Sequence, residues 1–335
     1  ESANISGQYL NWYSGDREYI SGDTITFADP YHATMLFGMK NSMWFTRKVF
    51  NFKNGVLRYE WQDIYNIKSV DSLPNTVTPA RFVAVEFSPD GDIAYGATEP
   101  DHEGNACIYR VSNLHACTVP VHASFQAYAK DSITDVGEVR LTQIQTLGKI
   151  PGRYITDLAV DPHNPEVLIV TMGQYGNDNY IYVASEAATT ASDSFDDNFV
   201  PLQGNLPNVP VYTACVNTNP DNMNQLLIGT DYGVFVNDDY LATTADWAQG
   251  NQGLGHYPVF DIRQYRRPVR LSGTYTMGDF VIATHGRGVF VDTAHRYTIV
   301  GVDNPDHSSS ITSGSSLGIT VYPNPAQNEA YVSVS

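Results

Sequence analysis

The sequence predicts an all-β protein built as a β-propeller, and three observations lead to this fold class. LIGTDYGVFV at 227–236 and VIATHGRGVFV at 281–291 are nearly the same sequence, each with the pattern of a strand, a tight turn and a second strand. A turn dipeptide ending in proline recurs before hairpins of this kind. No amphipathic helix of three or more turns is evident. Together they favour an array of repeated β modules.

The repeated unit contains more than the hairpin. Residues 199–212 align without a gap on residues 247–260, which pairs Phe199 with Trp247 and Tyr212 with Phe260. This adds a third and a fourth strand to the unit. The same hairpin pattern, with loops of different length, is found at 36–46, at 93–98 with 107–112, and at 167–173 with 180–185.

Proline marks the start of each unit. Proline fixes φ and cannot donate to a sheet, so these positions belong between strands. A unit of roughly 40 to 60 residues with four short strands is typical of a propeller blade. We expect five four-stranded blades and leave a larger number open, with residues 7–23 as a candidate outer strand that closes the ring. The markers are Pro30, Pro89, Pro162 and Pro220, with Pro268 as the fifth.

Composition allows a large core and excludes two classes of partner. The chain has 335 residues and 42% apolar side chains, and its formal net charge is −17. Such a charge repels nucleic acid and anionic membrane surfaces. No run of eighteen apolar residues is present, so we expect no transmembrane segment. Because the chain begins at Glu1, we expect a processed product.

Three cysteines are too few for a disulfide scaffold. Cys107 and Cys117 are close enough in sequence to bridge neighbouring strands. A disulfide between them and two separate thiols are both left open. Cys215 lies in an apolar segment and is expected to be a buried hydrophobic residue.

The chain changes character near its C-terminal end. We assign residues 1–299 to the propeller and residues 300–318, rich in serine and glycine, to a linker. Residues 319–335 are predicted to form two strands, at 319–322 and 331–334, around a turn fixed by proline. They are expected to open a second β-domain.

This last segment resembles the start of the C-terminal sorting domain found in Bacteroidota proteins that the type IX secretion system exports. In that family a YPNPA-type turn opens an immunoglobulin-like sandwich. The resemblance implies export to the cell surface or the medium and contact with the secretion machinery. The later strands of the family domain do not follow in this sequence, which leaves open whether they are removed after export or the sequence ends before them. The residues that carry the likeness are Tyr322, Pro323, Asn324, Pro325 and Ala326.

The repeats are similar to sortilin-like and neuraminidase-repeat propellers, which are frequent in secreted Bacteroidota proteins. The likeness rests on residues 229–235, on Trp247 and on residues 283–290. The Asp-box of those repeats survives only as residues 237–240 running on to Trp247. This departure weakens the likeness to the enzymes of the group.

Two basic groups are candidate binding sites. His285 and Arg287 are flanked by glycines in a hairpin turn, so an imidazole and an anion-binding guanidinium are one interpretation. The favoured alternative is structural, with glycines at positive φ and Arg287 bonded to neighbouring carbonyls. The second group resembles an arginine cluster for a carboxylate, but a solvated loop or a docking patch is favoured. It comprises Arg263, Arg266, Arg267 and Arg270.

Acidic residues supply the remaining candidates. Asp157, Asp231 and Asp261 are the carboxylates that would act in catalysis if they met at the central channel. No cofactor is expected, and oxygen-rich loops make Ca²⁺ the one metal to consider, although ordinary exposed loops are favoured. These loops contain Asp178, Asp193, Asp196 and Asp197.

No standard catalytic motif is present in the sequence. The main hypothesis is therefore a secreted, non-enzymatic propeller at the cell surface that serves adhesion or complex assembly, with an outer-membrane protein or a glycan as partner. The alternative is a propeller enzyme of the glycoside hydrolase, sialidase or peptidase type.

Overall fold

The structure is a computed structural model of the whole chain. It describes residues 11–13, 34–39, 41–46, 51–53, 56–58, 62–66, 79–89, 91–114, 143–185, 190–265, 269–271, 274–298, 319–322 and 331–334. These residues form strands and two short 3-10 turns, η5 (Phe195–Asp197) and η6 (Pro220–Asn222), and contain no α-helix. The chain divides into two compact units, residues 1–264 with 281–291 and residues 265–280 with 292–335.

Four antiparallel sheets of the first unit have four strands each, as the predicted blades require. The strands of the first three sheets follow in order of position within the sheet. They are β1 (Asn11–Tyr13), β2 (Thr34–Met39), β3 (Ser42–Thr46) and β6 (Gln62–Asn66); β7 (Phe82–Phe87), β8 (Ala94–Thr98), β9 (Asn105–Ser112) and β10 (Gln143–Pro151); and β11 (Ile155–Val160), β12 (Leu168–Met172), β13 (Ile181–Ala184) and β14 (Val200–Pro201).

The fourth and fifth sheets continue this order, but the fifth has three strands among the described residues where we expected four. β1 is an edge strand of the first sheet and pairs there with β2. The described residues 11–13 therefore belong to the first sheet and do not add an outer strand to the last one, so the expectation for residues 7–23 is wrong for this part. A small hairpin completes the unit. The strands are β15 (Val211–Val216), β16 (Leu226–Thr230), β17 (Gly233–Asn237) and β18 (Ala248–Gln249); β19 (Val259–Gln264), β22 (Phe280–Thr284) and β23 (Gly288–Asp292); and β4 (Asn51–Lys53) with β5 (Val56–Arg58).

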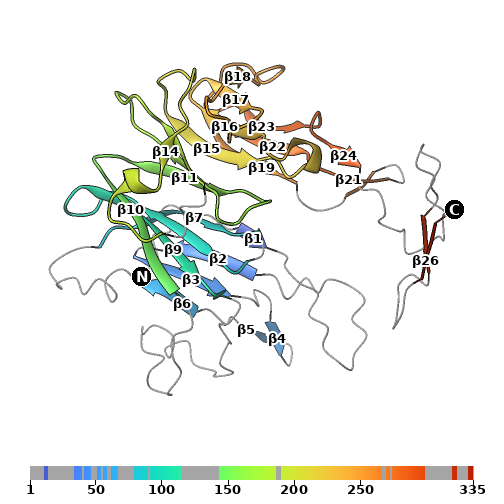
Figure 1. Cartoon of the computed structure of the whole chain (residues 1–335), viewed down its shortest axis with the longest axis horizontal. Coiled ribbons are helices and arrows are strands. Elements are labelled where there is room, and N and C mark those ends of the chain that lie inside the picture. Colours follow the sequence, from blue (N-terminus) through green and yellow to red (C-terminus); the bar gives the residue numbers. More distant parts are fainter. Residues whose placement is uncertain are drawn as a thin grey trace. The chain divides into compact units, whose positions relative to one another are not determined.

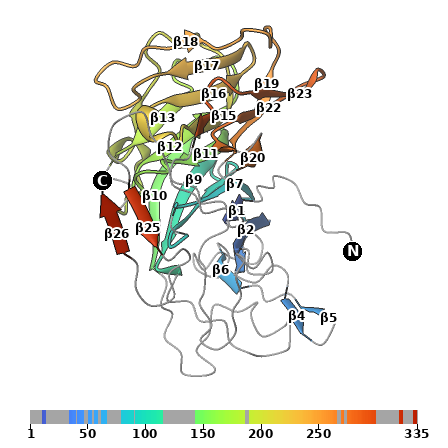
Figure 2. The same cartoon turned by 90° about the vertical axis from the view of Figure 1, so that its right-hand side faces the viewer.

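Successive sheets meet through their first strands. β7 lies beside β11, β11 beside β15 and β15 beside β19. Figures 1 and 2 show the sheets following one another in chain order, from blue through green to orange. β7, β8, β11, β12, β15 and β16 are buried almost throughout, as expected for strands covered on both faces. This arrangement confirms the predicted propeller fold.

The core lies between neighbouring sheets. One apolar cluster joins the second and third sheets around Tyr95, and another joins the third and fourth around Trp247. Glycine permits the closest approach: a Cβ at Gly229 would lie 2.7 Å from Cγ1 of Val259 on β19. The predicted equivalence of Phe199 and Trp247 is also seen, because both are buried at the start of a fourth strand.

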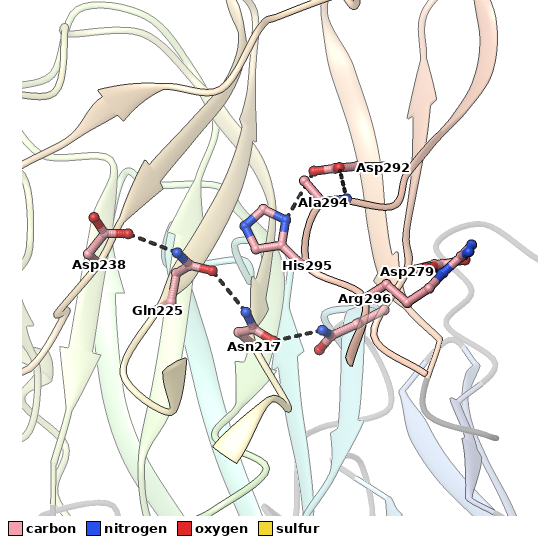
Figure 3. Close-up of polar contacts among 9 residues, drawn as sticks. Asn217, Gln225, Asp238, Asp279, Asp292, Ala294, His295 and Arg296 are labelled. Atoms are coloured by element: carbon pink, nitrogen blue, oxygen red, sulfur yellow. Dashed lines mark hydrogen bonds and ion pairs between the residues drawn. The ribbon is translucent and has the colours of Figure 1, made fainter. Parts of the chain in front are cut away.

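Side-chain amides join the ends of several strands in the first unit (Figure 3). Gln264 Nε2 donates to Asn217 Oδ1 over 2.7 Å, and Asn217 Nδ2 donates to Gln225 Oε1 over 2.8 Å. Gln225 Nε2 in turn donates to Asp238 Oδ1 over 2.8 Å. Because Asn217 and Gln264 are buried, these bonds satisfy groups that would be costly to leave unpaired.

The second unit holds a three-stranded sheet of β20 (Val269–Leu271), β21 (Thr274–Met277) and β24 (Tyr297–Thr298). Arg296 makes a bidentate ion pair with Asp279, with N···O distances of 2.7 and 2.5 Å (Figure 3). Near the end of the chain, β25 (Ile319–Tyr322) pairs antiparallel with β26 (Tyr331–Val334). These are the two strands predicted there.

Candidate binding face

One face of the first unit is formed where the first strand of each sheet begins. Ile155 at the start of β11 pairs with Met172, and Val211 at the start of β15 pairs with Thr230. The β12–β13 and β16–β17 connections therefore lie at this end of their sheets. In the fifth sheet, His285 N donates to Pro258 O over 2.8 Å, which holds the β22–β23 turn beside the start of β19.

A bulge at the start of the first strand recurs in three sheets. The pairing of β7, β11 and β15 with the next strand skips one residue, and these residues are Val83, Thr156 and Tyr212. A bulge bends the strand and re-aims the side chain that it carries. In β15 the bulge brings Tyr212 to the turn that carries Asp231.

Five side chains from three successive sheets form a continuous row on this face, which we call the aromatic row. The hydroxyl of Tyr175 donates to one oxygen of Asp231, and the hydroxyl of Tyr212 donates to the other over 2.8 Å. The ring of Tyr212 meets Phe260 edge to face at 4.7 Å, and Phe260 meets the His285 ring at 5.3 Å. Such edge-to-face contacts stabilise aromatic pairs.

The loop that presents Tyr175 has strained backbone. Gln174 has a φ of 73°, which is uncommon for a residue other than glycine. Asn177 holds this conformation, because its Nδ2 donates to Gln174 O over 2.9 Å and its backbone N donates to the Tyr180 hydroxyl over 3.0 Å. Tyr180 is fully buried, yet Tyr175 is 62% exposed. The strained backbone of this loop therefore presents an exposed tyrosine ring.

Partial burial shapes the electrostatics of the row. It raises the pKa of Asp231 above its usual range, and it also raises the pKa of the Tyr212 hydroxyl. A protonated phenol beside a carboxylate is a good hydrogen-bond donor, so the raised pKa of Tyr212 agrees with the Tyr212–Asp231 bond, whereas the raised pKa of Asp231 reflects its partial burial. Both oxygens of Asp231 are thereby occupied by tyrosine hydroxyls.

The turn that carries His285 and Arg287 has two glycines at positive φ, 84° for Gly286 and 94° for Gly288. His285 contributes its ring to the aromatic row. Arg287 lies over the ring of Tyr257, with 4.6 Å from Cζ to the centroid, where we expected bonds to neighbouring carbonyls. Cation–π contacts of this kind favour arginine because its guanidinium is planar and weakly hydrated.

The predicted catalytic carboxylates do not form one open site. Asp157 is 1% exposed, and its Oδ2 accepts from Thr213 Oγ1 over 2.8 Å and from Ala214 N over 3.3 Å. Burial raises the pKa of Asp157 to about 6, although nearby Arg263 acts in the opposite direction. Asp231 belongs to the aromatic row.

Arg263 links two sheets through carboxylates. Its Nε lies 2.9 Å from Asp261 Oδ1 on the same strand, and its Nη1 lies 3.6 Å from Glu86 Oε2 on β7. The Glu86 side chain is only 7% exposed. Arg263 therefore has structural partners, whereas its position in the sequence had grouped it with three arginines of the following loop. Arg266 and Arg267 lie outside the described residues, as does the side chain of Arg270 on β20.

The other predicted residues are dispersed. Among the described residues, no three histidine, cysteine, aspartate or glutamate side chains gather as metal ligands, and the four aspartates suggested for Ca²⁺ are not brought together as such a group. Asp193 pairs with Lys149 at 2.9 Å, and Asp197 accepts from Ser192 Oγ over 2.5 Å. Cys107 is buried on β9, as is Cys215 on β15, but Cys117 lies outside the described residues, so the disulfide stays a prediction. Of the sorting motif only Tyr322 lies in a described strand.

The sequence alone did not predict Tyr175, Tyr212 and Phe260 as site residues. One signal was present, because the repeat alignment paired Tyr212 with Phe260 at the start of two first strands, where other copies have Val83 and Thr156. An aromatic residue that recurs at a position where another repeat has a polar residue indicates a place on the surface. The contacts of these aromatic residues with Asp231 and His285 could be seen only in the structure.

No protein-family model matches the chain, and no curated protein matches its sequence. It is similar to solved structures that include a GH74 enzyme of Niastella koreensis, with 12% identity over 90% of this chain and 39% of that one and a TM-score of 0.36. Sqt1 of Chaetomium thermophilum, solved with the N-terminus of ribosomal protein L10, gives 16% identity, 87% and 62% coverage and a TM-score of 0.41. PorZ of Porphyromonas gingivalis, a surface component of the type IX secretion system, has 14% identity over 77% of this chain and 30% of its own, with a TM-score of 0.41.

The chain spans less than two thirds of each of these three structures. Their similarity to it is low, so the fold assignment rests on the sheets described above. No described helix is long and apolar enough to cross a membrane.

Proposed function

We propose that this propeller is a non-enzymatic binding module that engages its partner through the aromatic row. The observation that carries the proposal is the row itself: Tyr175 and Phe260 are large apolar side chains left 62% and 43% exposed, and they are joined through Asp231 and Tyr212. Exposed, clustered aromatic side chains are typical of binding surfaces. The strain at Gln174 beside Tyr175 supports the same conclusion.

The carboxylates argue against the enzyme alternative. A general acid must reach the bond that breaks, but Asp157 is sealed from solvent and bonded to the neighbouring strand. Asp261 is paired with Arg263, and Asp231 holds two tyrosine hydroxyls. Each carboxylate is accounted for by a structural bond.

The module is further proposed to act at the cell surface after export by the type IX secretion system. Support for this part is the sequence motif Tyr322–Ala326 and its resemblance to a sorting domain. Replacing Pro323 and Pro325 by alanine in the producing cell should leave the protein inside the envelope. Normal surface display of that variant would contradict this part of the proposal and leave the binding face untouched.

Envelope binding and hydrolysis test the main proposal. Purified protein should be retained on envelopes of the producing cells, and Tyr175→Ala should release most of it. Release of reducing ends from polysaccharides, or of amino termini from casein, should stay at the level of heat-inactivated protein. Hydrolysis that Asp231→Asn abolishes would overturn the proposal, as would envelope retention that does not depend on Tyr175.

A further inference from the structure

We infer that the aromatic row binds an uncharged polysaccharide, whose sugar rings stack on Tyr175 and Phe260 and whose hydroxyls bond to the polar groups between them. This inference rests on the proposed function and names the ligand class of the same face. It depends on the pattern of polar and apolar groups along the row, on the charge around it and on how rigidly the rings are held.

The pattern of the row suits a sugar chain. Each ring carries or touches a polar tip: Tyr175 and Tyr212 have hydroxyls, Asp231 lies between them, and His285 follows Phe260. A pyranose has C–H groups on its faces and hydroxyls on its edge. Aromatic faces take up the C–H groups, and the carboxylate and imidazole bond to hydroxyls. A purely apolar ligand would cover the Asp231 carboxylate and the His285 imidazole without offering them hydrogen bonds, which lowers its affinity.

Charge disfavours an anionic ligand. The chain has a net charge of −17, which opposes an anionic polymer. Arg287, in the turn that carries His285, lies over Tyr257. Arg153 donates to Asn179 O in the loop that carries Tyr175. Asp231 accepts one tyrosine hydroxyl at each oxygen, and these two bonds weaken its attraction for a cationic ligand. Its remaining lone pairs can still accept single hydroxyls of a neutral sugar.

The rings are held in place before any ligand arrives. Tyr175 is fixed by Asp231 at its tip and by the strained Gln174 at its base, and Phe260 is fixed between Tyr212 and His285. A side chain fixed in its bound orientation loses little conformational freedom on binding. This matters most for a weak, solvated ligand such as a neutral glycan.

Affinity electrophoresis in native gels tests the inference, with soluble β-glucan, galactomannan and dextran as the probes. At least one of the three should retard the wild-type protein. Tyr175→Ala and Phe260→Ala should each weaken that retardation about tenfold, because each removes one stacking ring. Tyr265→Ala is the matched control: Tyr265 is 47% exposed but belongs to the other compact unit, so its loss should leave retardation unchanged.

Folding must be separated from binding. Tyr175→Phe keeps the ring and removes only the hydroxyl, and Tyr175 is exposed, so both Tyr175 variants should unfold at the wild-type urea concentration. Retardation should fall less for Tyr175→Phe than for Tyr175→Ala. Equal retardation of all variants, or none with any neutral polysaccharide, would overturn the inference.

The two proposals fail in different ways. If envelope retention depends on Tyr175 while no neutral polysaccharide binds, the face is a binding face for another class of ligand and only the inference fails. Binding of a synthetic proline-rich peptide that competes with envelope retention would identify that class as protein. If envelope retention does not depend on Tyr175, the proposed function itself fails.

Discussion

Thr213 Oγ1 donates a hydrogen bond of 2.8 Å to Asp157 Oδ2, joining the first strands of the fourth and third sheets at a point that water does not reach. The bond crosses 56 residues of sequence. A buried carboxyl in this position makes the stability of the fold depend on pH.

The first prediction concerns Asp157 and pH. Burial raises its pKa in the folded protein from 3.8 to about 6, so the folded state holds the proton more tightly than the unfolded state. Its contribution to stability is then complete below about pH 4 and is lost as pH rises through about 6. Relative to Asp157→Asn, the wild type should lose about 2 to 3 kcal/mol of unfolding free energy between pH 4 and pH 8.

Urea unfolding of both proteins across this pH range measures that difference. Asn keeps the size of the side chain and one acceptor oxygen, so the variant should fold. A constant difference between the two proteins at all pH values would contradict the burial of a titrating Asp157.

Arg263 should tune this dependence. Its positive charge lowers the pKa of Asp157, while the negative charge of Asp261 raises it. Arg263→Met removes the positive charge and leaves the negative charge of Asp261 without its partner. The pKa of Asp157 should then rise, and the loss of stability should move to higher pH. Arg296→Met is the control, because Arg296 pairs with Asp279 in the other compact unit. A midpoint unchanged by Arg263→Met, or shifted equally by both variants, would rule out this coupling.

Tyr240 provides a second cross-sheet bond. Its hydroxyl donates over 2.5 Å to Oδ2 of Asp161, and both residues are buried. Tyr240→Phe should cost about 1 to 3 kcal/mol, because it leaves a buried carboxylate oxygen without this donor. Tyr232→Phe removes a hydroxyl from an exposed tyrosine and should change stability by less than about 0.5 kcal/mol. Chemical denaturation compares the two, and equal costs would mean that the Tyr240 bond contributes nothing.

Gly229 should not tolerate a side chain. An added Cβ would lie 2.7 Å from both Val259 Cγ1 and Val259 O, and backbone at that distance cannot move away cheaply. Gly229→Ala should therefore destabilise the protein by about 1 to 3 kcal/mol, the range expected for overpacking. Thermal unfolding measures the loss. A variant as stable as the wild type would mean that β16 and β19 are not as closely packed as described.

The sequence predicted the repeat and its strands well, because a hairpin that recurs with the same glycines and aromatic residues is a local pattern. Gly229 and Trp247 occupy the places that the repeat required. Candidate sites were harder. Asp157, Asp231 and Asp261 look alike in sequence, but one is sealed by Thr213, one binds two tyrosine hydroxyls and one pairs with Arg263. These differences arise from contacts between sheets, which no local pattern contains.

Tyr175 was missed for a related reason. It lies in a polar loop, and its outward position depends on the positive φ of Gln174 and on bonds from Asn177. Neither residue is an obligatory marker of that conformation.

The bulge at the start of the first strand would allow point substitutions to change the side chains of the proposed binding face. Because Val83, Thr156 and Tyr212 occupy the same backbone position in successive sheets, the residue there can be exchanged while the ladder on either side keeps its pairing. A tyrosine at position 83 would add a ring in the second sheet at the site corresponding to Tyr212. The ladder residues thus maintain the sheets, while in three of the sheets the bulge residue can vary without changing the strand pairing.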